Sequence, residues 1–571
     1  MGFSPTNEQR AIIDGDLQPQ CVVACAGSGK TATAVRRMLE IRKRLGNDRG
    51  YIALLSYSNI AVDTFRKEYA ALASIAPGVS RRVLISTVDS FITTHILLPH
   101  AARVMDCSRQ PFLVHGGEPF LNSFKVFNGT HNVGIEHLRV SFNNNKFVYA
   151  ESALYGSRKP VNPCDAENAI RKLGRTGAYT HDLARYWSLQ TLAQQERLIE
   201  ILARRFPYVL VDEAQDIGSM HGTLLEVLQE AGSTVSLIGD PNQAIYEFAD
   251  ADGSFLRDFQ QIPRAIGLPL TENRRSVKQI VSVANAISAI ESKVIREVPD
   301  RKHGAYFLLY DNNNLVQLVE TFASILKANN YAKSEAAILC RGSALVDRLS
   351  GEGGDTGQGA TERFALATIN RDRQCDIASA FKFALEGVLR LLASPPDTLR
   401  RDVLGASTEP TARVLRRLLW GFLKYSDTGL PCCSLPAKTK WHPALKSRIP
   451  PFLDALEKST SLKRSDSWGH NLTVKKLSDT PLWQEDLIAQ DFTGIRTQTI
   501  HQVKGEGINA VLYVAKKSDI DSLLSGPSSE EGRIGYVAIT RARDLLILGI
   551  PNTIPQSTLA NLKAINFLPW E

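Results

Sequence analysis

Short runs of apolar and β-branched residues recur along the chain, and stretches with helical composition separate several of them. In the first half these runs lie at residues 21–25, 51–56, 82–87, 208–212 and 235–240. The stretch TATAVRRMLEIRKRL, which follows the first run closely, has the composition of a helix. Strands that alternate with helices are typical of a parallel sheet covered by helices on both faces. We therefore predict an α/β fold for this half.

A second set of apolar runs follows in the other half, at residues 305–310, 336–341, 497–502, 510–515 and 544–549. It predicts a second α/β layer, although no sequence repeat relates the two halves. Each layer is interrupted once. Residues 96–175 are polar and rich in Asn, whereas residues 365–490 have mostly helical patterns broken by proline pairs. We read both segments as insertions.

Composition limits the class of protein. The chain has 571 residues, 43% of them hydrophobic and 22% charged, which is too long for one core and predicts three to four folding units. No apolar run reaches the roughly 18–20 residues of a membrane helix, and the first residues lack a secretory signal pattern. We expect a cytoplasmic protein with no membrane partner. The net charge of +8 permits a polyanionic partner.

The eight cysteines do not form a recognisable metal or disulfide pattern. None of them shows the C-x-x-C spacing of a zinc or iron–sulfur site. Cys432 and Cys433 are adjacent, which is a weak signal for a soft metal. We expect reduced thiols in a reducing compartment.

The stretch VVACAGSGKT, residues 22–31, predicts a phosphate-binding loop. Such a loop needs backbone N–H groups that face the phosphates, a lysine and a hydroxyl. Gly27 and Gly29 permit the tight turn, Lys30 can reach the β- and γ-phosphates, and Thr31 can ligate Mg²⁺. The loop follows an apolar run and opens a helix, as required. We assign ATP binding to Ala26, Gly27, Ser28, Gly29, Lys30 and Thr31.

A second motif, YVLVDEAQDI, supplies acidic groups for the same chemistry. Four apolar residues place Asp212 at the end of a strand, where it can hold magnesium through water. Glu213 beside it can orient and deprotonate an attacking water. The N-K-x-D motif that reads guanine is missing, because Asn145-Lys146 is followed by Phe147-Val148. An ATPase is therefore favoured over a GTPase, with ATP and Mg²⁺ as cofactors.

Further motifs occur in order along the chain: TNEQRAII, LLSYSNIAVDTF, ISTVDSF, DEAQD, GDPNQAIYEFADA, LTENRRS, TIHQVKGEG and EEGRIGYVAITRAR. Together with the phosphate loop they resemble the UvrD/Rep/PcrA-like helicases of superfamily 1. The resemblance implies two RecA-like parallel-sheet domains in tandem, each interrupted by a mainly helical insertion. The first domain is expected at residues 1–95 and 176–270 with its insertion at 96–175. The second is expected at residues 271–364 and 491–571 with its insertion at 365–490.

The same resemblance assigns further residues to the ATP site. Gln9 occupies the position at which the family reads adenine. Arg275 and Arg541 match positions that contact the γ-phosphate, where arginines stabilise the charge that develops in phosphoryl transfer. Gln243 matches the γ-phosphate sensor of the first domain. With Lys30 and Glu213, these three residues form the predicted catalytic set.

Aromatic residues at matched positions predict contacts with single-stranded DNA, which is held by base stacking and phosphate contacts. These residues are Tyr57, Tyr246 and Phe248, and ordinary core packing is the alternative for each. His501 either contacts the DNA backbone or fills the interface between the domains.

Several residues depart from the family pattern. Arg274 replaces a tyrosine that stacks on adenine, Ala32 an arginine that often follows GKT, and Ala249-Asp250 an Arg-Gly pair. Glu506 lies one place earlier than the glutamate of the family, and the second insertion, about 125 residues long, is shorter than is common.

We predict a 3′-to-5′ DNA translocase or helicase that acts on single strands and on junctions between single- and double-stranded DNA. The alternative is a DNA-sensing ATPase subunit that activates a partner nuclease, as in two-gene antiphage systems such as Gabija. A DNA clamp without turnover and an RNA helicase are further alternatives.

Overall fold

The computed structural model covers the whole chain, and most residues are described. The exceptions are residues 1–3, 47–49, 74–81, 115, 117, 153–158, 247–250, 263–264, 289, 313, 343–344, 347–348, 350–355, 373–376, 394, 397, 406–408, 478, 480, 483–494 and 571. The chain divides into two compact units. Unit 1 contains residues 1–114, 124–343 and 496–571, and unit 2 contains residues 115–123 and 344–495.

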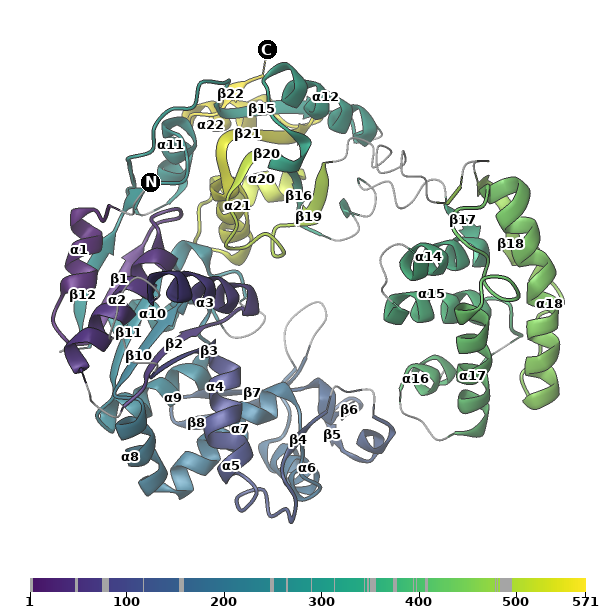
Figure 1. Cartoon of the computed structure of the whole chain (residues 1–571), viewed down its shortest axis with the longest axis horizontal. Helices are drawn as coiled ribbons and strands as arrows, with labels where there is room; N and C mark the ends of the chain where they lie inside the picture. Colours follow the sequence, from purple (N-terminus) through teal and green to yellow (C-terminus); the bar gives the residue numbers. More distant parts are fainter. Residues whose placement is uncertain are drawn as a thin grey trace. The chain divides into compact units, whose positions relative to one another are not determined.

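A six-stranded parallel sheet forms the first lobe of unit 1 (Figure 1). Its order is β12-β1-β11-β10-β2-β3, with β12 Ile266–Leu270, β1 Gln20–Ala24, β11 Thr234–Gly239, β10 Tyr208–Asp212, β2 Ile52–Ser56 and β3 Val83–Thr87. Every residue of β2 and β10 is buried, because a parallel sheet with helices on both faces leaves neither face to solvent. The helices of this lobe are α1 Asn7–Asp14, α2 Lys30–Leu45, α3 Asn59–Ala73, α4 Val88–Ile92, α9 Ser219–Glu230 and α10 Ser254–Phe259.

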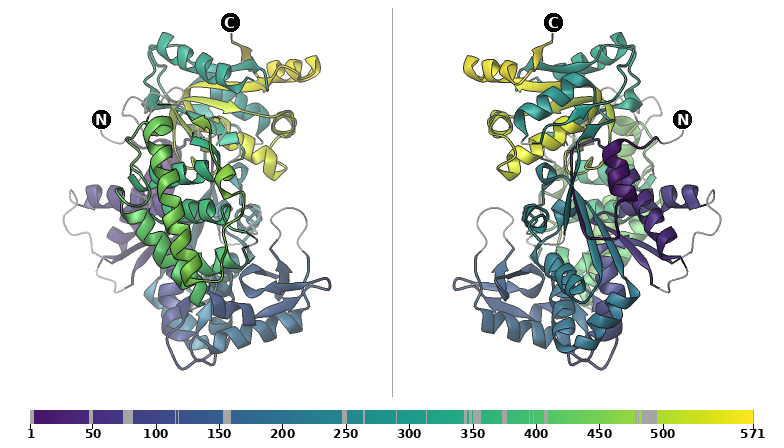
Figure 2. Two further views of the ribbon diagram at one scale, coloured as in Figure 1. Left: turned by 90° about the vertical axis from the view of Figure 1, so that its right-hand side faces the viewer. Right: turned by 90° about the vertical axis from the view of Figure 1, so that its left-hand side faces the viewer.

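A second six-stranded parallel sheet forms the second lobe (Figure 2). Its order is β19-β16-β20-β21-β15-β22, with β19 Arg496–Thr499, β16 Ala336–Cys340, β20 Ile508–Val514, β21 Ala542–Pro551, β15 Gly304–Tyr310 and β22 Leu568–Pro569. The flanking helices are α11 Lys278–Ile287, α12 Leu315–Ala328, α20 Lys517–Leu524, α21 Glu530–Arg541 and α22 Gln556–Ala564. The chain passes from one lobe to the other through β13 Glu272–Asn273, which pairs with β14 Lys293–Val294. The predicted α/β class with two parallel sheets is confirmed.

The part of the chain between α4 and β10, which includes the predicted insertion at residues 96–175, mixes helices with small sheets. Its strands are β4 Phe112–Leu113, β5 Lys125–Phe127, β6 Asn132–Gly134, β7 Leu138–Asn143, β8 Lys146–Glu151 and β9 Ala178–Tyr179, and its helices are α5 Leu98–His100, α6 Pro163–Arg175, α7 His181–Gln194 and α8 Glu196–Arg205. The Asn-rich stretch is the turn between β7 and β8, where Asn144 and Asn145 have φ values of 49° and 59°. Asn tolerates this left-handed conformation, which a tight hairpin requires.

Unit 2, called the accessory unit below, is mainly helical. Its helices are α14 Ala360–Asp372, α15 Ile377–Leu389, α16 Leu399–Leu404, α17 Pro410–Lys424, α18 His442–Ser459 and α19 Trp468–Asn471, and β17 Thr356–Gly359 pairs with β18 Leu472–Leu477. Its core contains Phe364, Leu419 and Trp441, each fully buried. No helix in the described part of the chain is long and apolar enough to span a bilayer.

Candidate functional site

The predicted phosphate loop joins the end of β1 to the start of α2. Gly27 and Gly29 have φ values of 77° and 84°, a left-handed conformation that glycine adopts without strain. Gly29 is the N-cap of α2, so the free N–H groups of that helix face the loop, as in anion-binding sites. Ala26 and Ser28 are buried, while Lys30 and Thr31 are half-buried.

Gln9 contacts the loop from α1. Its Nε2 donates to the carbonyl of Ser28 over 3.2 Å, and its Oε1 accepts from the Thr6 backbone N–H over 3.1 Å. The second bond belongs to a capping box that fixes the start of α1. The buried amide of Gln9 is therefore held in one orientation beside the predicted nucleotide.

Asp212 is the last residue of β10 and Glu213 follows it, and the positive charge of Lys30 acts on both carboxylates. Glu213 adopts a left-handed conformation with a φ of 52°, which is uncommon for a residue other than glycine and occurs often at functional sites. Burial raises the pKa of Asp212, and the neighbouring Glu213 raises it further. Burial alone would also raise the pKa of Glu213, but Lys30, Lys504 and the Gln215 amide together hold it below its ordinary value.

The two acidic residues differ in their hydrogen bonds. Gln215 Nε2 donates to Glu213 over 2.5 Å, which fixes that carboxylate. Asp212 Oδ1 is buried and has no hydrogen-bond partner among the described residues. A buried carboxylate oxygen without a donor suits a divalent cation or one of its water ligands. The residues present therefore fit Mg²⁺, with Asp212 and the Thr31 hydroxyl as the predicted ligands.

Gln243 links the first lobe to the second. Its Nε2 donates to Asp240 over 2.6 Å, and its Oε1 accepts from Arg541 Nη2 over 2.9 Å. Arg541 ends α21 and is buried. A residue of the second lobe is thereby held against the predicted γ-phosphate sensor of the first.

Arg275 lies directly against the phosphate loop. A Cβ built on Gly27 would be 2.5 Å from the Cβ of Arg275. Burial, together with the neighbouring positive charges of Arg541 and Arg543, lowers the pKa of Arg275 to about 9. Burial also lowers the pKa of Arg541, although Glu213 and Asp240 oppose this effect. Neither Arg275 nor Arg541 forms an ion pair with a described carboxylate, so both guanidinium groups remain able to pair with a bound anion.

The chain segment that joins the lobes is bonded to both. Asn273 Nδ2 donates to the carbonyl of Ala26 over 2.8 Å, and the Arg274 N–H donates to the carbonyl of Gly27 over 2.9 Å. On the other side, Ser276 Oγ donates to the carbonyl of Ala542 over 2.6 Å. The phosphate loop and the second lobe therefore share one connecting segment.

Three of the four residues predicted to bind DNA form one cluster. The rings of Tyr57 and Tyr246 stack with centroids 5.3 Å apart, and the ring of His501 lies 6.0 Å from that of Tyr246. His501 Nε2 also lies 3.3 Å from the carbonyl of Ile245. Phe248, Ala249 and Asp250 lie outside the described residues.

Lys504 connects this cluster to the acidic motif, and sequence reasoning did not select it. Its ammonium lies 2.7 Å from both carboxylate oxygens of Asp216 and 2.8 Å from the carbonyl of Gln243. It also lies 4.5 Å from the ring centroid of Tyr246, within range of a cation–π interaction. Lys504 and Asp216 both lie in motifs that occur in order along the chain, and this position is the sequence signal that could have identified them.

The first half of the chain matches a known protein family. Residues 5–150 and 161–263 match the model of the UvrD/REP helicase N-terminal domain. These residues are therefore similar to the N-terminal domain of UvrD/REP helicases. Both the phosphate loop and the acidic motif of this UvrD-like chain lie inside the matched residues.

Curated relatives of the UvrD-like chain support the same assignment. It is 24% identical over 312 residues to the ATP-dependent DNA helicase UvrD1 of Mycobacterium tuberculosis, covering 50% of this chain and 39% of the relative. It is 25% identical over 361 residues to the ATP-dependent DNA helicase UvrD2 of the same organism, covering 60% and 47%. The ATP-dependent DNA helicase PcrA of Leuconostoc citreum is 24% identical over 302 residues, covering 49% and 38%. The chain spans less than half the length of these relatives.

Proposed function

We propose that the chain is an ATP-hydrolysing motor that moves along single-stranded DNA in the 3′-to-5′ direction and unwinds duplexes at junctions. The observation that carries this proposal is the bond between Arg541 and Gln243. It joins a cation of the second lobe to the γ-phosphate sensor of the first, beside the phosphate loop. A nucleotide between the lobes would therefore control how tightly they close.

In the proposed reaction, a water attacks the γ-phosphorus of ATP. Its oxygen forms the new P–O bond, the bond to the β,γ-bridging oxygen breaks, and Glu213 accepts the proton of the water. Gln215 keeps the Glu213 carboxylate oriented. Lys30, Arg275 and Arg541 balance the charge that moves onto the leaving ADP. Mg²⁺, when bound at Thr31 and Asp212, would neutralise phosphate charge.

Coupling to DNA would pass through Lys504 and Tyr246. Lys504 contacts Asp216, three residues after Glu213, and also the ring of Tyr246. A change at the nucleotide thus has a short path of direct contacts to the aromatic cluster. The direction of movement rests on the family resemblance.

The first test is steady-state ATP hydrolysis with and without single-stranded DNA, with Glu213→Gln as control. Strong stimulation by DNA that the control loses would support a DNA-coupled motor. Strand displacement on duplexes with a 3′ or a 5′ tail then tests unwinding and direction. Turnover that DNA leaves unchanged would contradict the proposal.

A second candidate is a DNA-sensing ATPase that regulates a partner nuclease and unwinds little. The observation that favours it is the ion pair between Glu506 and Arg496, 2.7 Å apart. Glu506 is the displaced glutamate of the KGEG motif, and this ion pair binds it to another residue of the second lobe. Co-purification with a nuclease, with no strand displacement, would favour this candidate over the motor.

A further inference from the structure

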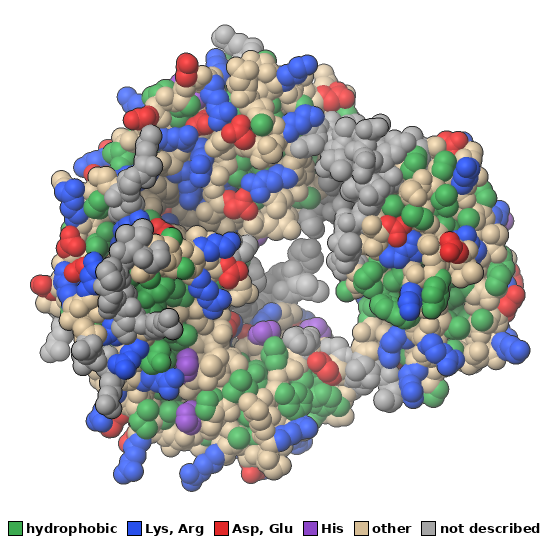
Figure 3. Space-filling view, in the orientation of Figure 1, with side chains coloured by type: hydrophobic (Ala, Val, Ile, Leu, Met, Phe, Trp, Pro, Cys, Tyr) green, Lys and Arg blue, Asp and Glu red, His purple; other side chains and the backbone are tan. Residues whose placement is uncertain are grey.

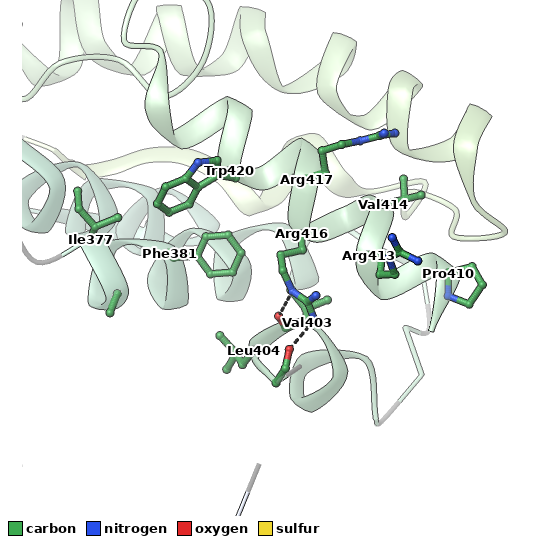
Figure 4. A pocket seen from close by; sticks show the side chains of 12 residues that line it. Ile377, Phe381, Val403, Leu404, Pro410, Arg413, Val414, Arg416, Arg417 and Trp420 are labelled. Atoms are coloured by element: carbon green, nitrogen blue, oxygen red, sulfur yellow. Dashed lines mark hydrogen bonds between the residues drawn. The ribbon is translucent and has the colours of Figure 1, made fainter. Parts of the chain in front are cut away.

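The accessory unit contains an open apolar groove between α15, α16 and α17, with a volume of about 1180 Å³ (Figure 4). The rings of Phe381 and Trp420 lie in it with centroids 6.1 Å apart. Trp420 is 49% exposed, Leu404 42% and Ile377 39%. Figure 3 shows hydrophobic side chains gathered on the face of the accessory unit. Large exposed apolar surfaces of this kind usually mark an interaction site.

The charged residues among the described lining of the groove are all positive. Arg413, Arg416 and Arg417 belong to this lining, and none of its described residues is a carboxylate. Arg416 donates to the carbonyls of Val403 and Gly405, so it holds the end of α16 against α17 (Figure 4). Arg413 and Arg417 are exposed, one turn apart on α17, and form no ion pair with a described residue. They are available to an anionic partner.

We propose that the groove of α15–α17 binds an acidic amphipathic helix of a partner protein. Its volume exceeds the roughly 300–1,000 Å³ of small-molecule sites, so a chain segment suits it better. A helix that inserts two or three apolar side chains would cover the apolar floor, and acidic side chains flanking them would meet Arg413 and Arg417. This proposal is independent of the ATPase.

Nucleic acid suits the groove less well. Single strands bind through aromatic platforms and a continuous cationic track, whereas aliphatic and proline side chains make up much of this lining, including Ile377, Val403, Leu404 and Pro410. Such side chains match the apolar face of a helix. The two arginines supply a charged rim on one side.

The experiment selects a display library of amphipathic helical peptides, about five turns long, against the full chain. We expect the enriched peptides to carry apolar residues at i, i+4 and i+7 with Glu or Asp beside them. Their affinity should fall by about tenfold or more for Leu404→Asp and for the double variant Arg413→Glu, Arg417→Glu. Lysine in place of the peptide's acidic residues should abolish binding to the wild type and restore it to the double variant.

Val474→Asp is the matched control, because Val474 is an exposed apolar residue of the same unit, 41% exposed, outside the groove. It should leave peptide affinity unchanged. Enriched peptides without acidic residues, or with affinity unaffected by Leu404→Asp, would overturn the proposal. A loss of affinity for a single-stranded oligothymidylate in the same variants would reassign the groove to nucleic acid. Self-association that Leu404→Asp abolishes would reassign it to a second copy of the chain.

Discussion

Lys504 and Asp216 form an ion pair between the two lobes, with the ammonium 2.7 Å from each carboxylate oxygen. The side chains are 8% and 2% exposed. Loss of one partner of a buried pair costs about 3–5 kcal/mol, because the remaining charge is left without compensation. This pair therefore makes the contact between the lobes sensitive to single substitutions.

Lys504→Met should lower the thermal midpoint of unit 1 and remove the stimulation of ATP hydrolysis by DNA, since the contacts with Asp216 and Tyr246 disappear together. Calorimetry and steady-state ATPase assays measure the two effects. Adding Asp216→Asn should recover much of the stability and none of the stimulation. Equal stability of the wild type and Lys504→Met would show that the pair contributes nothing.

Arg541→Ala should reduce kcat by about 10³-fold or more, as expected for an arginine that stabilises charge in phosphoryl transfer. Binding of a fluorescent ATP analogue should change far less, because the loop of Gly27 to Thr31 remains intact. Steady-state hydrolysis at saturating ATP measures kcat, and Arg543→Ala is a neighbouring arginine control. A tenfold loss of nucleotide binding with unchanged kcat would contradict this role.

Gly27→Ala should abolish ATP binding. The added Cβ would lie 2.5 Å from the Cβ of Arg275, and the φ of 77° disfavours a side chain. Gly46 at the end of α2 also has a positive φ, 52°, but no atom of the described residues lies within 4 Å of its added Cβ. Gly46→Ala should therefore cost about 1–3 kcal/mol of backbone strain and leave nucleotide binding intact, as measured by calorimetric titration.

Tyr246→Ala should weaken binding of single-stranded DNA by about 1–3 kcal/mol, the usual contribution of one stacked base. Tyr246→Phe keeps the ring and should retain most of the affinity. Fluorescence anisotropy with a labelled oligothymidylate measures both, and Tyr425→Ala, at an exposed position of the accessory unit, is the control. If Tyr246→Phe and Tyr246→Ala weaken DNA binding equally, Tyr246 does not contribute to binding by stacking on a base.

Stability should fall as pH drops below about 6.5, in part through His221. Its ring nitrogen lies 2.8 Å from Asp89, and Arg185 donates to the same carboxylate. Burial lowers the pKa of His221 and Arg185 lowers it further, while Asp89 and Asp182 oppose them. The unfolded chain therefore takes up a proton at higher pH than the folded chain, so protonation favours unfolding as pH falls from about 6.5 toward the lowered pKa.

Melting curves of the wild type and His221→Asn between pH 7.5 and 5.5 test this dependence. The difference between their midpoints should narrow as pH falls, because the variant lacks the titrating group. A constant difference would show that His221 titrates at the same pH in both states.

Local features of the fold and site could be predicted from the sequence. The apolar runs of β2 and β10 predicted buried parallel strands, and the glycines of the phosphate loop predicted a turn. Both predictions were possible because each pattern consists of residues that are close together in the sequence. The hairpin at Asn144 and Asn145 was read only as an Asn-rich break, since two short strands carry little periodicity. The roles of the individual site residues remain predictions.

Contacts across the lobes could not be predicted in this way. Lys504 and Asp216 are 288 residues apart, and neither residue's neighbours indicate that they meet. The stacking of Tyr57 on Tyr246 likewise depends on how loops after two different strands approach each other. Motif order predicted which segments matter, whereas the tertiary fold determines which side chains touch.

The segment from Asn273 to Ser276 has a mechanical consequence. Asn273 is bonded to the phosphate loop and Ser276 to the second lobe, with only Arg274 and Arg275 between them. So short a connection can extend very little. Rotation of the second lobe must therefore displace the phosphate loop unless the backbone dihedral angles of these few residues change. The stiffness of four residues would then set how much of each lobe rotation is transmitted to the loop, and glycines introduced there would let the lobes turn without strain at the nucleotide.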